Sequence, residues 1–268
     1  MDILVCIKQV PDTKDIKLDP ETNTLKREGV ESIVNPFDMY AVETALMLKD
    51  EWGGTVRAVT MGPPQAEQAL REVVSYGVDE VALFSDRAFA GADTWATAYT
   101  LAKGIRKLGD FDLIICGKQA VDGDTAQVGP GLAQQLDLPF ITFVRRIVKI
   151  ELDSRTMVVE RLMDDGYDVV ETSLPALLTV VKEINELRVP SLKGKMKAKK
   201  IDIPIYSAAD LEVDPDSVGL TGSYTQVIEV FAPKPRGNRI ILEGETEEQV
   251  EKLLNGLTKD KVLSVKID

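Results

Sequence analysis

The residues of this sequence best suited to binding an anion lie in one glycine-rich stretch at 116–131, which reads CGKQAVDGDTAQVGPG. An apolar run at 111–116 precedes it and an apolar-periodic segment at 128–138 follows, so the stretch is expected to join a strand to a helix. Such a loop offers free backbone N–H groups and the positive end of a helix dipole. The pattern therefore indicates a nucleotide-phosphate site at the carboxyl end of a parallel strand.

Individual residues of this stretch have distinct expected roles. Gly117 and Gly123 can adopt positive φ and let a phosphate approach the backbone closely. Asp124 or Thr125 can cap the following helix, and the Thr125 hydroxyl can also donate to a phosphate oxygen. Neither common phosphate fingerprint is present, because Gln134 stands where a third glycine is needed and no Gly-Lys-Ser/Thr occurs. A loop that only turns the chain and caps a helix is the alternative, and composition alone leaves both open.

Composition excludes several classes of chemistry. Histidine is absent from the 268 residues, which removes Ser-His-Asp, Cys-His and histidine–metal sites. The two cysteines, Cys6 and Cys116, lie in apolar runs and are expected to be buried thiols in a reducing compartment. No catalytic acid or base stands out, so any redox reaction must be carried by a cofactor. A net charge of −12 argues against nucleic acid and anionic membranes as general partners.

The location of the protein is predicted from its hydropathy. No apolar run is long enough to cross a bilayer, so membrane insertion is not expected. The sequence begins directly with a strand-like run, and we expect no signal peptide. A cytoplasmic protein is predicted.

The first half of the chain alternates apolar runs with helical periodicity, which predicts an α/β fold with a doubly wound, mostly parallel sheet. The expected strands are residues 2–10, 55–61, 80–84 and 111–116, and the expected helices are 36–52, 65–76, 94–108 and 128–138. Residues 11–30 are polar and turn-rich, which indicates a long excursion with room for a short hairpin. Ligands of such sheets bind at the carboxyl ends of the strands.

Residues at or just after the carboxyl ends of such strands are candidates for a single pocket. They are Cys6, Lys8, Asn35, Pro36, Phe37, Asp38, Met61, Gly62, Cys116, Gly117, Lys118, Gln119, Asp122, Gly123, Asp124, Thr125, Ala126, Gln127 and Val128. Asn35 is expected to cap the helix that starts at Pro36. Lys8, Asp38 and Lys118 can tune the charge around a bound group, although charged residues at strand ends more often face solvent.

The pattern changes after residue 140. Residues 146–151, 157–162 and 167–171 alternate apolar and polar side chains, which predicts an antiparallel hairpin insertion, and the buried run 174–181 is expected to return to the sheet.

Residues 185–200 show no regular period and carry five lysines, which favours an exposed loop. Residues 208–237 are rich in Asp, Pro, Ser and Gly and predict an extended arm. An amphipathic helix at 246–257 then needs an apolar surface elsewhere, so we expect it to pack on another subunit.

Three separated motifs resemble the electron transfer flavoprotein beta-subunit family. They are Gly117-Lys118-Gln119-Ala120 with Asp122, Asp124, Gln127 and Gly129; Asn35-Pro36-Phe37; and Met196-Lys197-Ala198-Lys199-Lys200. Residues 159–166 and 174–179 also resemble the family's signature. The chain departs from it at Asp168, where the family usually has Glu or Gln, and this weakens that one motif.

This resemblance implies a fold, partners and two domains. The fold would be Rossmann-like, of the adenine nucleotide alpha hydrolase type, with a nucleotide-binding domain at 1–205 and a C-terminal arm and helix at 206–268. The arm and helix would pack on the alpha subunit of a heterodimer. Residues 185–200 would form the recognition loop for partner dehydrogenases, with Leu192 as the apolar anchor. Thr94, otherwise a helix cap like Asp93, would lie near the nucleotide.

The nucleotide implied by the resemblance is FAD or a structural AMP. Small residues at Gly123 and Ala126 leave room for FAD, and the loop resembles that of flavin-bifurcating members. In those, FAD on this subunit takes hydride from NADH. One electron then passes to ferredoxin or flavodoxin, and the other passes through the alpha-subunit FAD to an acyl-CoA dehydrogenase. NADH oxidation is expected only if the protein bifurcates and only with the alpha subunit. The alternatives are a non-bifurcating carrier subunit with AMP, and a nucleotide-binding protein without a redox role.

Overall fold

A computed structural model describes residues 1–12, 17–18, 25–26, 32–228 and 240–263 of the chain. It divides into two compact units, Met1–Glu229 and Val230–Asp268. This division falls later than the expected boundary at 205/206, because residues 206–228 pack on the first unit, where Leu211 and Val218 are buried. The predicted arm therefore stays against the sheet over that stretch.

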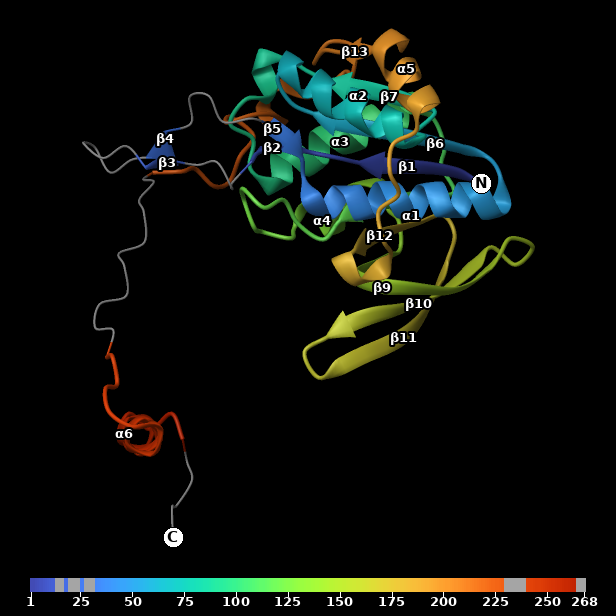
Figure 1. Cartoon of the computed structure of the whole chain (residues 1–268). Coiled ribbons are helices and arrows are strands. Elements are labelled where there is room, and N and C mark those ends of the chain that lie inside the picture. Colours follow the sequence, from blue (N-terminus) through green and yellow to red (C-terminus); the bar gives the residue numbers. More distant parts are fainter. Residues whose placement is uncertain (13–16, 19–24, 27–31, 229–239, 264–268) are drawn as a thin grey trace. The chain divides into compact units, whose positions relative to one another are not determined.

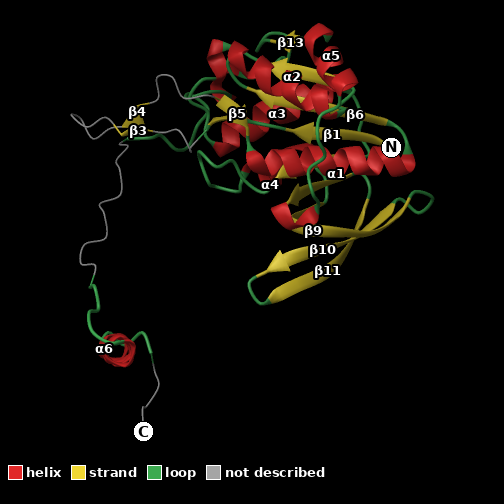
Figure 2. Ribbon diagram, viewed as in Figure 1, coloured by secondary structure: helices red, strands yellow, loops and turns green. Residues whose placement is uncertain are grey.

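The elements follow one another as Figures 1 and 2 show. The strands are β1 (Asp2–Cys6), β2 (Gln9–Pro11), β3 (Lys17–Leu18), β4 (Leu25–Lys26), β5 (Ser32–Val34), β6 (Thr55–Met61), β7 (Glu80–Phe84), β8 (Leu113–Gly117), β9 (Phe140–Glu151), β10 (Thr156–Met163), β11 (Gly166–Ser173), β12 (Ala176–Val180) and β13 (Ile205–Tyr206). The α-helices are α1 (Pro36–Trp52), α2 (Glu67–Tyr76), α3 (Thr94–Leu108), α4 (Val128–Leu136), α5 (Leu192–Lys200) and α6 (Thr246–Lys259).

The nine-stranded sheet confirms the predicted α/β fold. Its order is β11-β10-β9-β12-β8-β1-β6-β7-β13, and β12, β8, β1, β6, β7 and β13 are parallel to their neighbours in that run. From β1 the chain builds outward through β6 and β7, then returns to place β8 on the other side of β1. The order therefore reverses between β1 and β8, the position at which ligands of doubly wound sheets bind.

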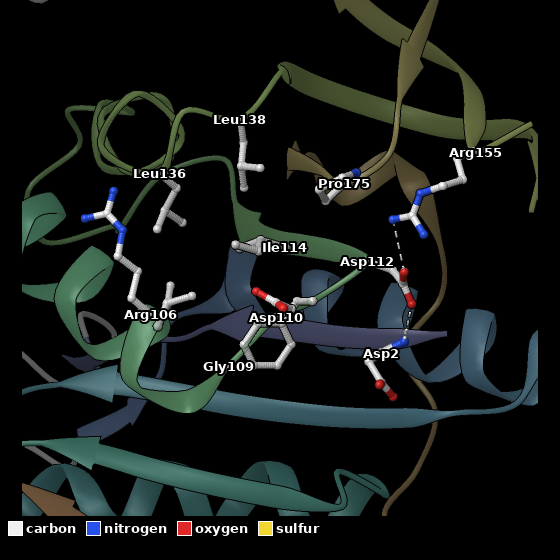
Figure 3. Close-up of a pocket in the computed structure, with 12 residues that line it drawn as sticks. Asp2, Arg106, Gly109, Asp110, Asp112, Ile114, Leu136, Leu138, Arg155 and Pro175 are labelled. Carbon is white, nitrogen blue, oxygen red and sulfur yellow. Dashed lines mark hydrogen bonds and ion pairs between the residues drawn. The ribbon is translucent and has the colours of Figure 1, made fainter.

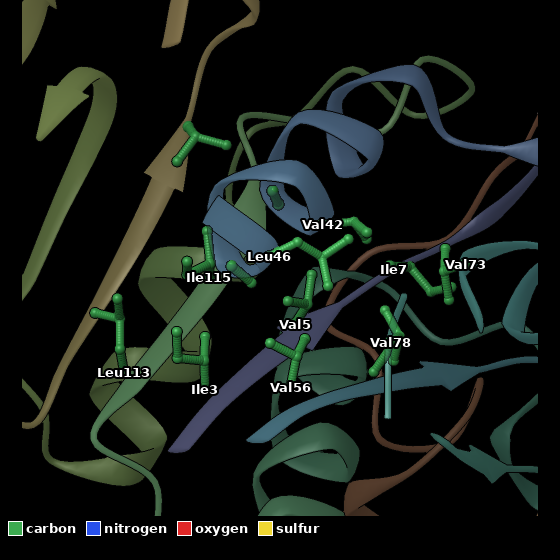
Figure 4. Packing of buried hydrophobic residues seen from close by; sticks show 14 of the residues in the cluster. Ile3, Val5, Ile7, Val42, Leu46, Val56, Val73, Val78, Leu113 and Ile115 are labelled. Carbon is green, nitrogen blue, oxygen red and sulfur yellow. The ribbon is translucent and has the colours of Figure 1, made fainter. Parts of the chain in front are cut away.

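Helices cover both faces of the sheet, as the alternating apolar runs of the strands require. Side chains such as Ile3, Val5 and Ile115 point to the face under α1 and α2 (Figure 4). The intervening residues, among them Leu4 and Ile114, point to the face under α3 and α4. Side chains on both faces of β1 and β8 are buried, so these two strands form a rigid base for the groups at their carboxyl ends.

The predicted hairpin insertion is present as three antiparallel strands, β9, β10 and β11, which extend the sheet beyond β12. β9 starts parallel to β12 and then leaves it to pair with β10. The predicted return of 174–181 to the sheet is confirmed by β12, which lies between β8 and β9 with every residue buried. Within the excursion at 11–30, β3 and β4 pair as a short hairpin, and the rest lies outside the described residues apart from Pro11, the last residue of β2, and Asp12.

The prediction of a loop throughout 185–200 is wrong, because 192–200 forms helix α5. Ser191 caps it by accepting a hydrogen bond from Gly194 N at 2.9 Å. Gly194 and Ala198 face α2 so closely that a Cβ on Gly194 would lie 2.8 Å from the carbonyl carbon of Ser75. The contact face is built from small residues rather than large apolar ones, so it produces no apolar periodicity.

The predicted C-terminal helix is confirmed as α6 in the second unit. Val250, Leu253 and Leu254 lie on one face of it, and they are 50%, 48% and 38% exposed. Among the residues that the structure describes, no helix combines the length and apolar character that a membrane span requires.

Candidate functional site

The carboxyl ends of β1 and β8 meet the first turn of α1 around a buried carboxyl group. The backbone N–H of Lys8 donates to Asp38 Oδ2 at 2.7 Å, and the Gly117 amide also donates to this carboxylate. Burial raises the pKa of Asp38 from 3.8 to about 7, against the opposing effect of hydrogen bonds from Asn35, Lys8 and Gly117. One side chain thus joins two strand ends to one helix start.

Gly117 is required here by close packing rather than by backbone conformation. A Cβ at this position would lie 2.7 Å from the carbonyl carbon of Phe37 and 2.8 Å from Asp38 N. The expectation of positive φ is wrong for both Gly117 and Gly123, neither of which adopts it. The left-handed residues of the loop are Asp124 and Ala126, each with φ of 54°.

Asn35 holds the loop instead of capping α1. Its side chain makes no capping bond to the helix. The amide group donates to Gln119 O at 2.8 Å and accepts from Val121 N at 3.1 Å. Each contact joins residues more than 80 positions apart in the sequence, and Asn35 is fully buried. The short polar side chain that sequence interpretation assigns to a cap therefore serves as a tertiary clamp.

The loop closes on itself with two further contacts. Gln119 Nε2 donates to Asp124, whose N–H in turn donates to Ala120 O at 2.8 Å. Lys8 Nζ forms an ion pair with Asp122 at 2.7 Å. The expected capping of α4 by Asp124 or Thr125 is wrong, because Gln127 occupies the N-cap position and no side chain caps that helix.

Two helix N-termini thus reach the same edge of the sheet. α1 begins beside Lys8, whose carbonyl accepts a hydrogen bond from Asn35 N at 2.8 Å. α4 begins directly after the loop, and its first turn receives no side-chain cap. Uncapped N–H groups and the positive ends of helix dipoles stabilise a bound anion. The arrangement suits phosphate.

The remaining predicted site residues lie at the border of this edge. Met61 ends β6, the neighbour of β1, and Gly62 follows it and donates its N–H to Phe84 O at 3.1 Å. Thr94 touches the loop through Gln127, with 3.4 Å between their side-chain oxygens. Asp93 is the cap of α3, accepting from the amides of Trp95 and Ala96 at 3.0 Å.

Both cysteines are buried free thiols, as predicted. Cys6 and Cys116 lie opposite each other on the paired strands β1 and β8. Their mutual hydrogen bond, together with burial, raises the pKa of the Cys6 thiol well above its ordinary value. Cys6 is therefore protonated at neutral pH and belongs to the floor of the site. Within the described ranges, no cluster of acidic or cysteine side chains is arranged to hold a metal ion.

A separate cavity of about 640 Å³ lies at the opposite edge of the sheet (Figure 3). It is lined at the amino ends of β1 and β8, where Asp112 accepts from Asp2 N at 2.9 Å and pairs with Arg155 at 3.4 Å. None of the predicted site residues lines it. The candidate nucleotide site is thus an open edge closed by a loop, distinct from this cavity.

Leu192 lies away from the nucleotide loop, at the first turn of α5, and is 78% exposed. The segment leading to it is fixed across α1: Asn185 donates to Tyr40 O at 3.0 Å. Arg188 pairs with the buried carboxylate of Glu43 at 2.8 Å. The anchor predicted for partner docking therefore projects from a rigid support.

Comparison with known proteins identifies the family. Residues 22–211 match the model of the electron transfer flavoprotein domain. The chain is 48% identical over 264 residues to the electron transfer flavoprotein subunit beta of Thermoanaerobacterium thermosaccharolyticum, covering 98% of this chain and 100% of that protein. It is 49% identical over 262 residues to subunit CarD of the caffeyl-CoA reductase-Etf complex of Acetobacterium woodii, covering 97% and 99%. It is 48% identical over 243 residues to protein FixA of Azotobacter vinelandii, covering 89% and 86%.

Two of the three motifs that suggested the family from sequence build the edge described above, and the third lies in α5. Asn35 clamps the loop that starts at Gly117, and α5 carries the lysine-rich motif. The identity is nearly one half and extends over most of the length of these relatives. Such a match is enough to assign the chain to their family. The chain belongs to the electron transfer flavoprotein family, as a member of its beta subunits.

Proposed function

We propose that the edge formed by β1, β8, α1 and α4 binds the nucleotide of an electron-carrying heterodimer. The observation that carries this proposal is the loop 118–127, fixed by Asn35 in front of an uncapped helix N-terminus. Backbone N–H groups and the Lys118 ammonium supply donors for phosphate oxygens, and Asp38 and Asn35 fix the loop that carries them. The chain's own residues bind and orient the nucleotide, and the cofactor supplies the redox chemistry.

FAD is the nucleotide we favour over AMP. Gly123 is open, since a Cβ there would meet no atom within 4 Å, and Ala126 is small. A dinucleotide needs this extra room. The relative CarD belongs by name to a complex of a CoA-ester reductase with Etf. With FAD bound to this chain, we propose that the heterodimer takes up hydride from NADH and bifurcates electrons to ferredoxin or flavodoxin and, through the alpha-subunit FAD, to an acyl-CoA dehydrogenase.

Nucleotide content decides between the two forms of this function. The chain is co-expressed with its alpha subunit, purified mildly and denatured, and the released nucleotides are separated and counted. We expect two FAD and no AMP per heterodimer, with bleaching of flavin absorbance on addition of NADH. One FAD and one AMP would establish a non-bifurcating carrier subunit with a structural nucleotide. No nucleotide on this chain would overturn the site itself.

The docking face of α5 combines an apolar centre with a basic border. Leu192 and Met196 lie one turn apart and are 78% and 56% exposed, and Val189 before the helix is 85% exposed. Lysines at 193, 195, 199 and 200 surround them. Such a surface fits an apolar pocket with acidic residues around it on a partner dehydrogenase.

Leu192→Ala should weaken binding to the acyl-CoA dehydrogenase about tenfold or more, as loss of a central apolar anchor does. Stability should be unchanged, because the side chain is exposed. Surface plasmon resonance with the dehydrogenase measures the first effect, and thermal unfolding measures the second. Leu187→Ala, which lies in the same segment but before the docking face, is the matched control. Equal binding by the Leu192 variant would exclude this residue as the anchor.

The second unit is proposed to pack on the alpha subunit. The apolar face of α6 at Val250, Leu253 and Leu254 is half-exposed and needs a partner surface to be buried. The beta subunits of this family pair with an alpha subunit, and we propose that this partner buries the apolar face of α6.

A further inference from the structure

Phe143 has an unusual backbone conformation at the border of the nucleotide loop. Its φ is 57°, in the left-handed region that a bulky residue rarely adopts. It lies in β9 where the pairing with β12 shifts register between Leu178 and Val180. The Phe143 N–H donates to the hydroxyl of buried Thr179 at 3.1 Å, which fixes this conformation. A strained residue that the surrounding structure holds in place points to a function for its side chain.

The conformation places the phenyl ring beside Lys118. The Lys118 ammonium lies 5.6 Å from the centre of the Phe143 ring and 5.7 Å from the centre of the Phe37 ring. Both distances are within the range of cation–π attraction. The backbone of Lys118 is fixed as well, since its N–H donates to Val180 O at 2.9 Å. Within the described residues, no carboxylate pairs with this ammonium, in contrast to Lys8 and its partner Asp122.

We propose that Phe143 is a positioning residue that, together with Phe37, holds the Lys118 ammonium for a phosphate of the nucleotide. Two aromatic faces restrict the lysine and remove part of its hydration without neutralising its charge. An ammonium that is already ordered loses less entropy when it meets a phosphate oxygen. The inference rests on the proposed nucleotide site and adds the residue that sets its phosphate affinity.

A smaller residue would satisfy the backbone better than phenylalanine. Glycine adopts this φ without strain but supplies no ring. Leucine retains apolar volume but has no π face, whereas tyrosine retains the ring. These differences separate a role of the ring toward Lys118 from a role in packing alone.

The test compares phosphate-bearing and phosphate-free ligands. The heterodimer of this chain with its alpha subunit is first freed of nucleotide. It is then titrated with AMP and with adenosine by calorimetry. Phe143→Leu should lower AMP affinity about tenfold and leave adenosine affinity unchanged, in keeping with one cation–π contact. Phe143→Tyr should retain wild-type affinity for both. Lys118→Met should likewise lower AMP affinity and leave adenosine affinity unchanged. The double variant Phe143→Leu/Lys118→Met should bind AMP no more weakly than Lys118→Met does.

Additive losses in the double variant, or equal losses for AMP and adenosine, would overturn the inference and leave the nucleotide site in place. If the wild-type complex binds neither AMP nor FAD on this chain, the proposed function fails instead. Should Phe143→Leu not fold, Phe37→Leu replaces it, with the same expected loss restricted to AMP. A Phe37 variant that binds AMP as the wild type does would then contradict the role of the two rings.

Discussion

Asp38→Asn should remove a contribution that lowers the free energy of unfolding of the wild-type protein as pH rises from 4 to 7. The pKa of Asp38 is 3.8 in its ordinary state and about 7 in the folded protein. Between these values the unfolded chain has released the proton that the folded chain retains, so the free energy of unfolding falls as pH rises. At 1.36 kcal/mol per pH unit the decline is on the order of 4 kcal/mol. Asparagine does not titrate and removes this dependence.

Urea unfolding of the nucleotide-free protein, followed by tryptophan fluorescence from pH 4 to pH 8, measures the effect. The quantity compared is the difference in unfolding free energy between wild type and variant, because other groups titrate in both. Asp86→Asn is the control. Hydrogen bonds from Ala88 N and Ala208 N hold the pKa of Asp86 below its ordinary value of 3.8, so its contribution to stability is lost only at lower pH, and the difference in unfolding free energy between this variant and wild type should stay nearly constant from pH 4 to pH 8. Parallel curves for wild type and Asp38→Asn would show that the Asp38 carboxyl does not titrate in this range.

Gly117→Ala should destabilise the first unit by about 2–3 kcal/mol, as overpacking of a close contact does. The added carbon would lie 2.7 Å from the Phe37 carbonyl carbon and 2.8 Å from Asp38 N, so the first turn of α1 must move away from β8. That movement separates Asp38 from the Gly117 amide and Asn35 from the loop. We therefore expect the purified heterodimer to lose the nucleotide of this chain as well.

Gly123→Ala is the matched control within the same loop. A Cβ at Gly123 meets no atom of this chain within 4 Å, and its φ is not in the left-handed region, so the stability of this variant should stay near wild type. Thermal unfolding and counting of released nucleotide measure both variants. A Gly117→Ala protein with wild-type stability and full nucleotide content would contradict the packing argument.

Local sequence patterns predicted the framework of this site well. The strands at 55–61 and 80–84 and the helix at 36–52 match β6, β7 and α1 in both bounds. These elements depend on apolar periodicity and on Pro and Gly at their ends, which are properties of neighbouring residues. The clustering of candidate residues at strand carboxyl ends also followed from alternation of strands and helices alone.

Predictions that assigned a partner to a polar residue or a conformation to a glycine were less successful. Asn35 was expected to cap α1, yet its amide bonds Gln119 and Val121, which only the pairing of β1 with β8 brings near it. Gly117 was expected to adopt positive φ beside a phosphate, yet its φ is not positive and the absence of a side chain makes room for α1. In each case the residue type was informative, while the contact that uses it spans tens of residues.

The sequence by itself determined the α/β class, the loop at 116–131 and the family to which the chain belongs, because each of these depends on residues close together or on motifs in fixed order. Only the tertiary structure decided the strand order, the helical state of α5 and the approach of Phe143 to Lys118. These depend on which surfaces meet. Small residues such as Gly194 and Ala198, or one phenylalanine in an apolar strand, show their role only when the opposing surface is in place.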